Sequence, residues 1–231
     1  MRLAPRWSSF VMLSVAALLV VVGGLMASNM SFKVSVPLDA PTTAVSHSGI
    51  NLVSLPYIPQ QDLVALEDPD TPGRMTAGGL LQHINQGVCI GKPAAAVQKY
   101  DRLTDLPLLS YDGCSGMDFV LEPGEAYFVI MRETADLRIS GTHDPTFIIE
   151  FLPESAGVSK SGRQLYAHPY HGVASTAYEL VMEIGALQIE KYDRTTDSFV
   201  PYPGSANFDL TAGEGYLVRV SSITNYIPAH Y

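Results

Sequence analysis

One cluster of residues has the types and spacing of a metal site. His168 and His171 are the closest pair of histidines, and the carboxylate of Glu179 follows a few residues later. However, residues three apart in a strand point to opposite faces, and Pro169 interrupts the strand pattern between them. We therefore interpret these histidines as turn or surface residues, and we predict no metal and no cofactor for this chain.

Acid and base groups suggest two hydrolytic sites, and neither is complete. His143 and Asp144 are adjacent like two members of a triad, but no Gly-x-Ser-x-Gly motif supplies a nucleophile. Glu125 and Glu214 would suit the carboxylate pair of a glycoside hydrolase. They are equivalent residues of a duplicated motif, which favours a turn or edge-strand role. The sequence thus predicts no catalytic residues and a protein that is not an enzyme.

The duplication is the strongest signal in the chain. KYDRLTD at 99–105 recurs as KYDRTTD at 191–197, and GEAYFV at 124–129 recurs as GEGYLV at 213–218. A residue shared by both copies is explained by the fold, whereas a residue found in one copy is free to serve a function. We divide the chain into an N-terminal segment, 1–31, a first module, 32–146, and a second module, 147–231.

Alternating apolar residues, Gly and Pro predict a mainly β fold with one short helix in each module. The expected pairs of equivalent segments are strands at 32–37 and 147–152, strands at 49–57 and 162–170, helices at 79–84 and 177–184, hairpins beginning at 97–100 and 187–192, and strand pairs at 118–129 and 207–218. Each module is small for a hydrophobic core of its own, so we expect the two to pack together.

A family resemblance follows from these segments. GINLVSLP at 49–56, with Tyr-Asp-x-x-Thr and Phe-x-Leu-x-x-Gly-Glu-Ala-Tyr after it, resembles the GWNLISLP repeat modules of exported bacterial surface proteins. Ile50 replaces the Trp of that motif, and Arg163-Gln164 begin the equivalent stretch of the second module. The resemblance covers almost everything after residue 31. It implies tandem β modules with a structural or adhesive role and no catalytic motif.

The N-terminus predicts a membrane anchor. Residues 10–27 carry no charge and follow Arg2 and Arg6. A helix of this length spans about 27 Å, close to the hydrocarbon thickness of a bilayer. The positive-inside rule then leaves the N-terminus in the cytoplasm and places the modules in the periplasm or outside the cell. Secretion after signal cleavage is the alternative, although Leu25 stands where a cleavage site needs a small residue.

The net charge restricts the kinds of partner that the chain can bind, and the cysteines restrict the disulfides that it can form. The net charge of −9 argues against nucleic acid, because binding to phosphates needs a basic surface. The two cysteines, Cys89 and Cys114, form no CxxC motif, and each lies in sequence that the other module lacks. A disulfide between them would contribute about 3 to 4 kcal/mol, and two buried free thiols are the alternative.

The first module also holds an insertion, 58–96, in which the chain needs twice as many residues as the second module between equivalent motifs. Loops on a rigid scaffold commonly carry binding surfaces, and tyrosine is a frequent anchor in interfaces. The residues that we predict to contact a partner are Tyr57, Gln60, Asp62, Asp68, Asp70, Tyr170, Tyr178 and Tyr226.

The whole pattern predicts a membrane-anchored, extracytoplasmic binding or scaffold protein. We expect it to be an accessory structural subunit of a larger membrane complex, with other membrane or periplasmic proteins as partners and the bilayer around residues 10–27. A surface adhesin or carbohydrate-binding module that uses exposed tyrosines is the alternative.

Overall fold

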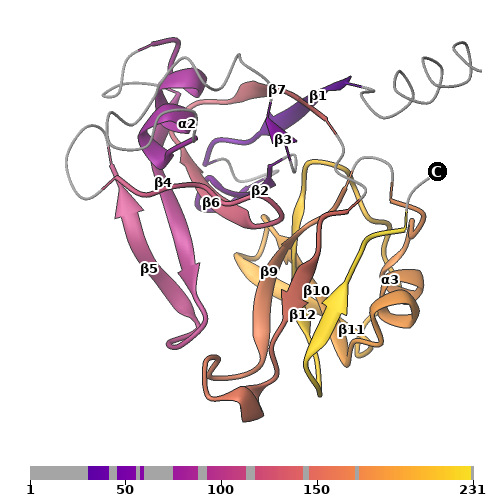
Figure 1. Ribbon diagram of the computed structural model, residues 1–231. Helices are drawn as coiled ribbons and strands as arrows, with labels where there is room; N and C mark the ends of the chain where they lie inside the picture. The colour runs from indigo at the N-terminus through magenta and orange to yellow at the C-terminus, as the bar shows by residue number, and fades with distance from the viewer. Residues whose placement is uncertain are drawn as a thin grey trace, which may run out of the picture. The chain divides into compact units, whose positions relative to one another are not determined.

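Antiparallel strands are the main regular structure of the described residues, which confirms the predicted mainly β fold (Figure 1). The computed structural model describes residues 31–41, 46–55, 58–59, 75–87, 93–112, 118–142, 146–169 and 172–229. Residues 32–231 belong to one compact unit. Among the described residues no helix has the length and apolarity needed to cross a bilayer. The predicted anchor, 10–27, lies outside these residues and stays a prediction.

The first module contains a four-stranded sheet and a three-stranded sheet, in the orders β2-β6-β4-β5 and β1-β7-β3. Helix α2 packs mainly against β4. The elements are β1 (Ser31–Leu38), β2 (Ile50–Ser54), β3 (Ile58–Pro59), α2 (Ala77–Ile84), β4 (Ala94–Asp101), β5 (Leu106–Tyr111), β6 (Ala126–Met131) and β7 (Ala135–Thr142).

The second module has the same arrangement in shorter form. Its four-stranded sheet has the order β9-β12-β10-β11, and β8 pairs with β13. The elements are β8 (Ile149–Phe151), the 3-10 turn η2 (Glu154–Ala156), β9 (Arg163–Ala167), α3 (Ala177–Ile184), β10 (Gln188–Asp193), β11 (Ser198–Tyr202), β12 (Gly215–Arg219) and β13 (Thr224–Tyr226). Each strand of this sheet corresponds in order to one in the first module, so the sequence repeat is a repeat of topology.

Both predicted helices are present and begin in the same way. Thr76 and Thr176 are the N-caps, and each side chain accepts a hydrogen bond from the backbone N–H three residues later. In α3 the Glu179 carboxylate completes a capping box. The inner faces are apolar, with Leu80 and Leu180 fully buried. Equivalent caps and equivalent buried leucines therefore set both helices on their sheets.

Two details of the sequence prediction are wrong. Asn51 Nδ2 donates to the carbonyl of Asp39, and Gln164 Nε2 makes the same bond to the carbonyl of Leu152. Asp39 therefore corresponds to Leu152, two residues away from the alignment of 32–37 with 147–152. In addition, the stretch around Val120 makes a single bridge to the α2 cap instead of a strand.

Candidate binding groove between the two modules

The modules meet through two equivalent backbone hydrogen bonds. Ser54 N donates to Gly213 O, and Ala167 N donates to Gly124 O, both at 2.9 Å. Ser54 corresponds to Ala167, and Gly124 corresponds to Gly213. Each module therefore presents the same surface to the other, as two subunits do across a two-fold axis. We call this relation the local two-fold.

Apolar side chains fill the contact around the local two-fold. Leu52, Phe128 and Leu217 belong to one buried cluster that spans both modules. Gly215 lies against Ala126, its counterpart in the first module, and a Cβ on Gly215 would stand only 2.3 Å from the Ala126 Cβ. Only one of the two equivalent positions has room for a methyl group. The presence of Ala in GEAYFV and of Gly in GEGYLV is thus explained by packing at the interface.

The repeated KYDR turns dock each module on the other. Lys160 N donates to Arg102 O, and His47 N donates to Arg194 O, both at 2.8 Å. These pairs are equivalent, because Lys160 corresponds to His47. The motif therefore has the same structural role in both copies, because the backbone carbonyl of its arginine binds the other module.

The aspartate that ends each turn gathers hydrogen bonds from both modules. Asp197 accepts from Ser48 Oγ at 2.7 Å, from His47 Nδ1 at 2.8 Å and from Tyr192 Oη at 3.1 Å. Burial acts to raise the pKa of Asp197, but these hydrogen bonds outweigh it and hold that pKa below its ordinary value. Burial and the hydrogen bond to the carboxylate raise the pKa of Tyr192 to about 12. The Asp197 carboxylate therefore binds the modules together in its ionised form.

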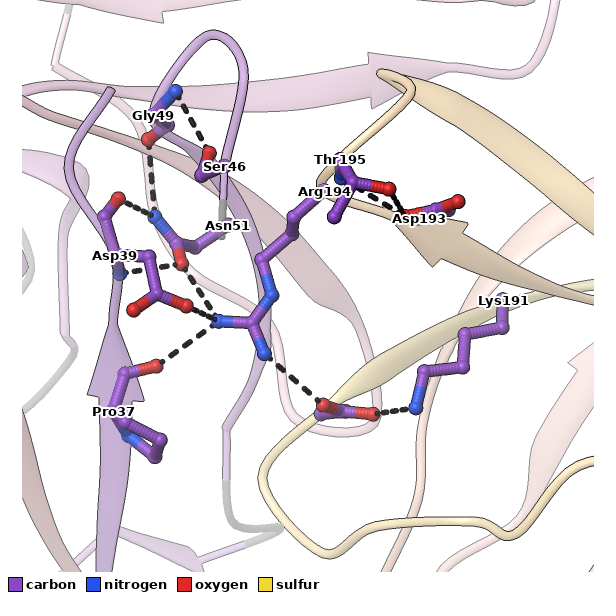
Figure 2. A network of polar contacts seen from close by, with 10 residues as sticks. Pro37, Asp39, Ser46, Gly49, Asn51, Lys191, Asp193, Arg194 and Thr195 are labelled. Atoms are coloured by element: carbon purple, nitrogen blue, oxygen red, sulfur yellow. Dashed lines mark hydrogen bonds and ion pairs between the residues drawn. The ribbon is translucent and has the colours of Figure 1, made fainter. Parts of the chain in front are cut away.

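Two grooves flank the interface in equivalent places, and side chains fill one of them. In this closed groove the Arg194 guanidinium donates to the Asp39 carboxylate, to Asn51 Oδ1 at 3.2 Å and to the Pro37 carbonyl at 3.4 Å (Figure 2). Its other end lies 3.7 Å from Glu214. The cavity that remains measures about 100 Å³. Arg194 is thus held by groups from both modules.

The equivalent groove on the other side is open. Its cavity measures about 430 Å³. Arg102 takes the place of Arg194 and donates to Gln164 Oε1 at 2.7 Å, but Leu152 stands where the closed groove has Asp39. Among the described residues no carboxylate lies within ion-pair distance of the Arg102 guanidinium. One substitution between the copies, Asp to Leu, therefore removes the group that closes the groove.

The open groove has an apolar wall, a charged wall and an acidic rim. The apolar wall is β8 with the residues before it, where Ile148 is 56% exposed. The lining also carries Arg102 and the ion pair of Lys99 Nζ with Glu125 Oε2, 2.7 Å apart. The lining residues are Lys99, Tyr100, Asp101, Arg102, the segment 122–126, the segment 147–152, Gln164 and Leu165.

Glu125 and Glu214, the two candidates for a hydrolytic pair, each bind a tyrosine and a lysine of their own module. Glu125 accepts from the Tyr127 hydroxyl at 2.9 Å, and Glu214 accepts from the Tyr216 hydroxyl at 3.2 Å. Burial first, and the neighbouring carboxylate second, raise the pKa of both tyrosines. Lys191 also pairs with Glu214 at 3.1 Å, as Lys99 does with Glu125. Equivalent partners on both glutamates fit a role in holding the turns.

Two of the three metal-site candidates, His168 and Glu179, lie among the described residues, and each has other partners. His168 is buried, its Nδ1 lies 3.3 Å from the Tyr166 hydroxyl, and burial lowers its pKa to about 4. The Glu179 carboxylate instead accepts from the backbone N–H groups of Ser175 and Thr176. Among the described residues no cluster of metal-binding side chains is found.

Two of the predicted partner residues, Tyr178 and Tyr226, lie among the described residues. Tyr178 lies exposed on α3, whereas Tyr226 is buried and donates to Glu183 Oε1 at 3.0 Å. The predictions that lie outside the described residues are His143, Asp144, His171, both cysteines, Tyr57, Gln60, Asp62, Asp68, Asp70 and Tyr170. The insertion and the disulfide stay predictions.

Sequence reasoning missed the groove because it compared the first strands in the wrong alignment. Ser46 Oγ accepts from Gly49 N, and Ser159 Oγ accepts from Gly162 N, both at 2.9 Å. The Ser-x-Ser-Gly motif that contains these residues is present in both modules and would have given the right alignment. That alignment would have matched Asp39 with Leu152. Comparison of the chain with protein-family models, with curated proteins and with solved structures finds no match.

Proposed function

We propose that this protein is a non-enzymatic binding or scaffold protein that holds a partner protein in the open groove. The observation that carries the proposal is the difference between two equivalent grooves in one chain. Arg194 is paired with the Asp39 carboxylate of its own chain, whereas Arg102 has no such carboxylate among the described residues and lies beside a cavity of about 430 Å³. A difference that opens one copy and leaves the shared fold intact is the pattern expected of a binding site.

The setting of this function follows from the N-terminal segment. Residues 10–27 hold the chain in the cytoplasmic membrane, and the modules stand on its outer side. There the protein acts as an accessory subunit that braces other membrane or periplasmic proteins. The tandem arrangement supports this role, because the backbone and apolar contacts at the local two-fold fix the groove between two modules.

The test is recovery of partners from native membranes in mild detergent. Full-length tagged protein should retain at least one partner in fixed proportion. Leu152→Asp rebuilds the carboxylate of the closed groove, so Arg102 gains an internal partner and the bound protein should be lost. Leu187→Asp is the matched control, since Leu187 is half exposed and lies after α3, outside the groove.

Two results would contradict the proposal. One is purification of the wild-type chain alone from its native membrane. The other is a partner that survives Leu152→Asp and is lost in Leu187→Asp, which would transfer binding to the exposed end of the second module. An anchored chain should also stay in the membrane after alkaline extraction, whereas a cleaved and secreted one would be released.

A further inference from the structure

One wall of the open groove is the edge of a sheet. Among the described residues β8 pairs only with β13, so its second edge lacks a strand partner. This edge and the residues before it, 147–152, line the cavity. An exposed strand edge offers backbone N–H and C=O groups that an extended peptide can pair with.

The closed groove shows which backbone groups face the cavity. There the Pro37 carbonyl accepts from Arg194, so the edge of β1 at residue 37 points into the groove. The proline also has no N–H, which blocks pairing with another strand. Its counterpart in β8 is Glu150, which has an N–H. Because the N–H and C=O of one strand residue point to the same side, Glu150 presents both groups to the open groove.

Charge restricts what can lie along this edge. Lys99 is already paired with Glu125, so Arg102 is the one cation of the lining, within the described structure, that lacks a carboxylate. The rim beside it carries the exposed acids Glu122 and Glu150. A ligand with a single carboxylate for Arg102 and with neutral or basic residues around it complements both features.

We infer that the open groove binds an extended peptide segment of a partner protein, which pairs along β8 and places one acidic side chain on Arg102. This inference rests on the proposed function and names its ligand. The Asp39 carboxylate on Arg194 is the internal model for that acidic side chain. The apolar wall around Ile148 takes the neighbouring side chains on the same face of the peptide.

The test is selection of a random octapeptide library, displayed on phage, against the full-length protein in detergent. We expect enriched peptides with one Asp or Glu at a fixed position, apolar or β-branched residues at alternate positions, and basic residues among the rest. Synthetic versions should lose at least tenfold in affinity when that acid becomes Asn or Gln. Arg102→Gln should produce the same loss.

A separate variant tests whether the peptide pairs along the edge of β8. Glu150→Pro copies Pro37 and removes the N–H at the edge together with the Glu150 carboxylate, whereas the residues of β8 on either side keep their N–H groups. It should lower peptide affinity at least tenfold with an unchanged melting temperature, and Glu150→Gln, which removes the carboxylate alone, should lower the affinity much less. Enrichment without an acidic position, no enrichment, or full binding by Glu150→Pro would overturn the inference. If Leu152→Asp still releases the native partner in that case, the proposed function stands and only its ligand is wrong.

Discussion

Gly215→Ala should destabilise the contact between the two modules, because the added methyl group has no space at the local two-fold. Its Cβ would stand 2.3 Å from the Ala126 Cβ and 2.9 Å from Leu52 Cγ, and both neighbours are buried. Overpacking of this kind costs about 1 to 3 kcal/mol. For a chain of this size that corresponds to a fall in melting temperature of about 2 to 12 °C.

The reciprocal change makes the prediction specific. Ala126→Gly alone should also destabilise the protein, by about 1 kcal/mol, through added backbone freedom and lost contacts. Gly215→Ala combined with Ala126→Gly moves the methyl group to the equivalent position across the local two-fold. The double variant should be within about 1 kcal/mol of wild type, so the two changes should rescue each other.

Thermal unfolding followed by near-ultraviolet circular dichroism of the tyrosines measures this well. The chain has 12 tyrosines, and its one tryptophan, Trp7, is outside the sequence of both modules, so the tyrosine signal is the one to follow. A Gly215→Ala protein as stable as wild type would refute the predicted packing. So would a double variant that is less stable than Gly215→Ala, because the methyl would then not be exchangeable between the modules.

Three further changes test the interface and the core. His168→Leu introduces the residue that the first module has at the equivalent position, Leu55. Because burial lowers the pKa of His168 in the folded protein to about 4, the free energy of unfolding of wild type should fall by up to about 3 kcal/mol between pH 7 and pH 4. Urea titrations at each pH should show a smaller fall for the variant. Asp197→Asn should flatten the loss of stability below about pH 4, since a depressed carboxyl pKa stabilises the fold above the unfolded value and fails as pH falls through the folded one. Asp39→Leu should cost about 1 to 3 kcal/mol in urea unfolding, because it strands the half-buried guanidinium of Arg194, and an unchanged midpoint would contradict the closed groove.

The repeat made much of the fold predictable. Both helices, both KYDR turns and the mainly β class follow from residues that recur, such as the capping threonines Thr76 and Thr176. The turn aspartates Asp105 and Asp197 both adopt a positive φ, 60° and 50°, which a short polar side chain tolerates. Local chemistry of this kind is readable in sequence because it depends on neighbours in the chain.

The groove was not predictable in the same way. It depends on contacts between residues more than a hundred positions apart, such as Arg194 with Asp39. The first strands also differ in length, eight residues in β1 against three in β8, and a pattern with period two does not fix their alignment between copies. The repeated motifs correctly identified the shared structure. The residue that distinguishes the two grooves is Leu152, and its importance appears only when it is aligned with Asp39.

Crosslinking from equivalent positions of the two grooves distinguishes a partner bound in the open groove from one bound elsewhere. A photoreactive phenylalanine analogue at Ile148 faces the open groove, and the same analogue at Ser35, its counterpart, faces the closed one. In native membranes we expect a discrete crosslinked partner from position 148 and none from position 35. Equal crosslinking from both positions, or none from position 148, would contradict binding in the open groove.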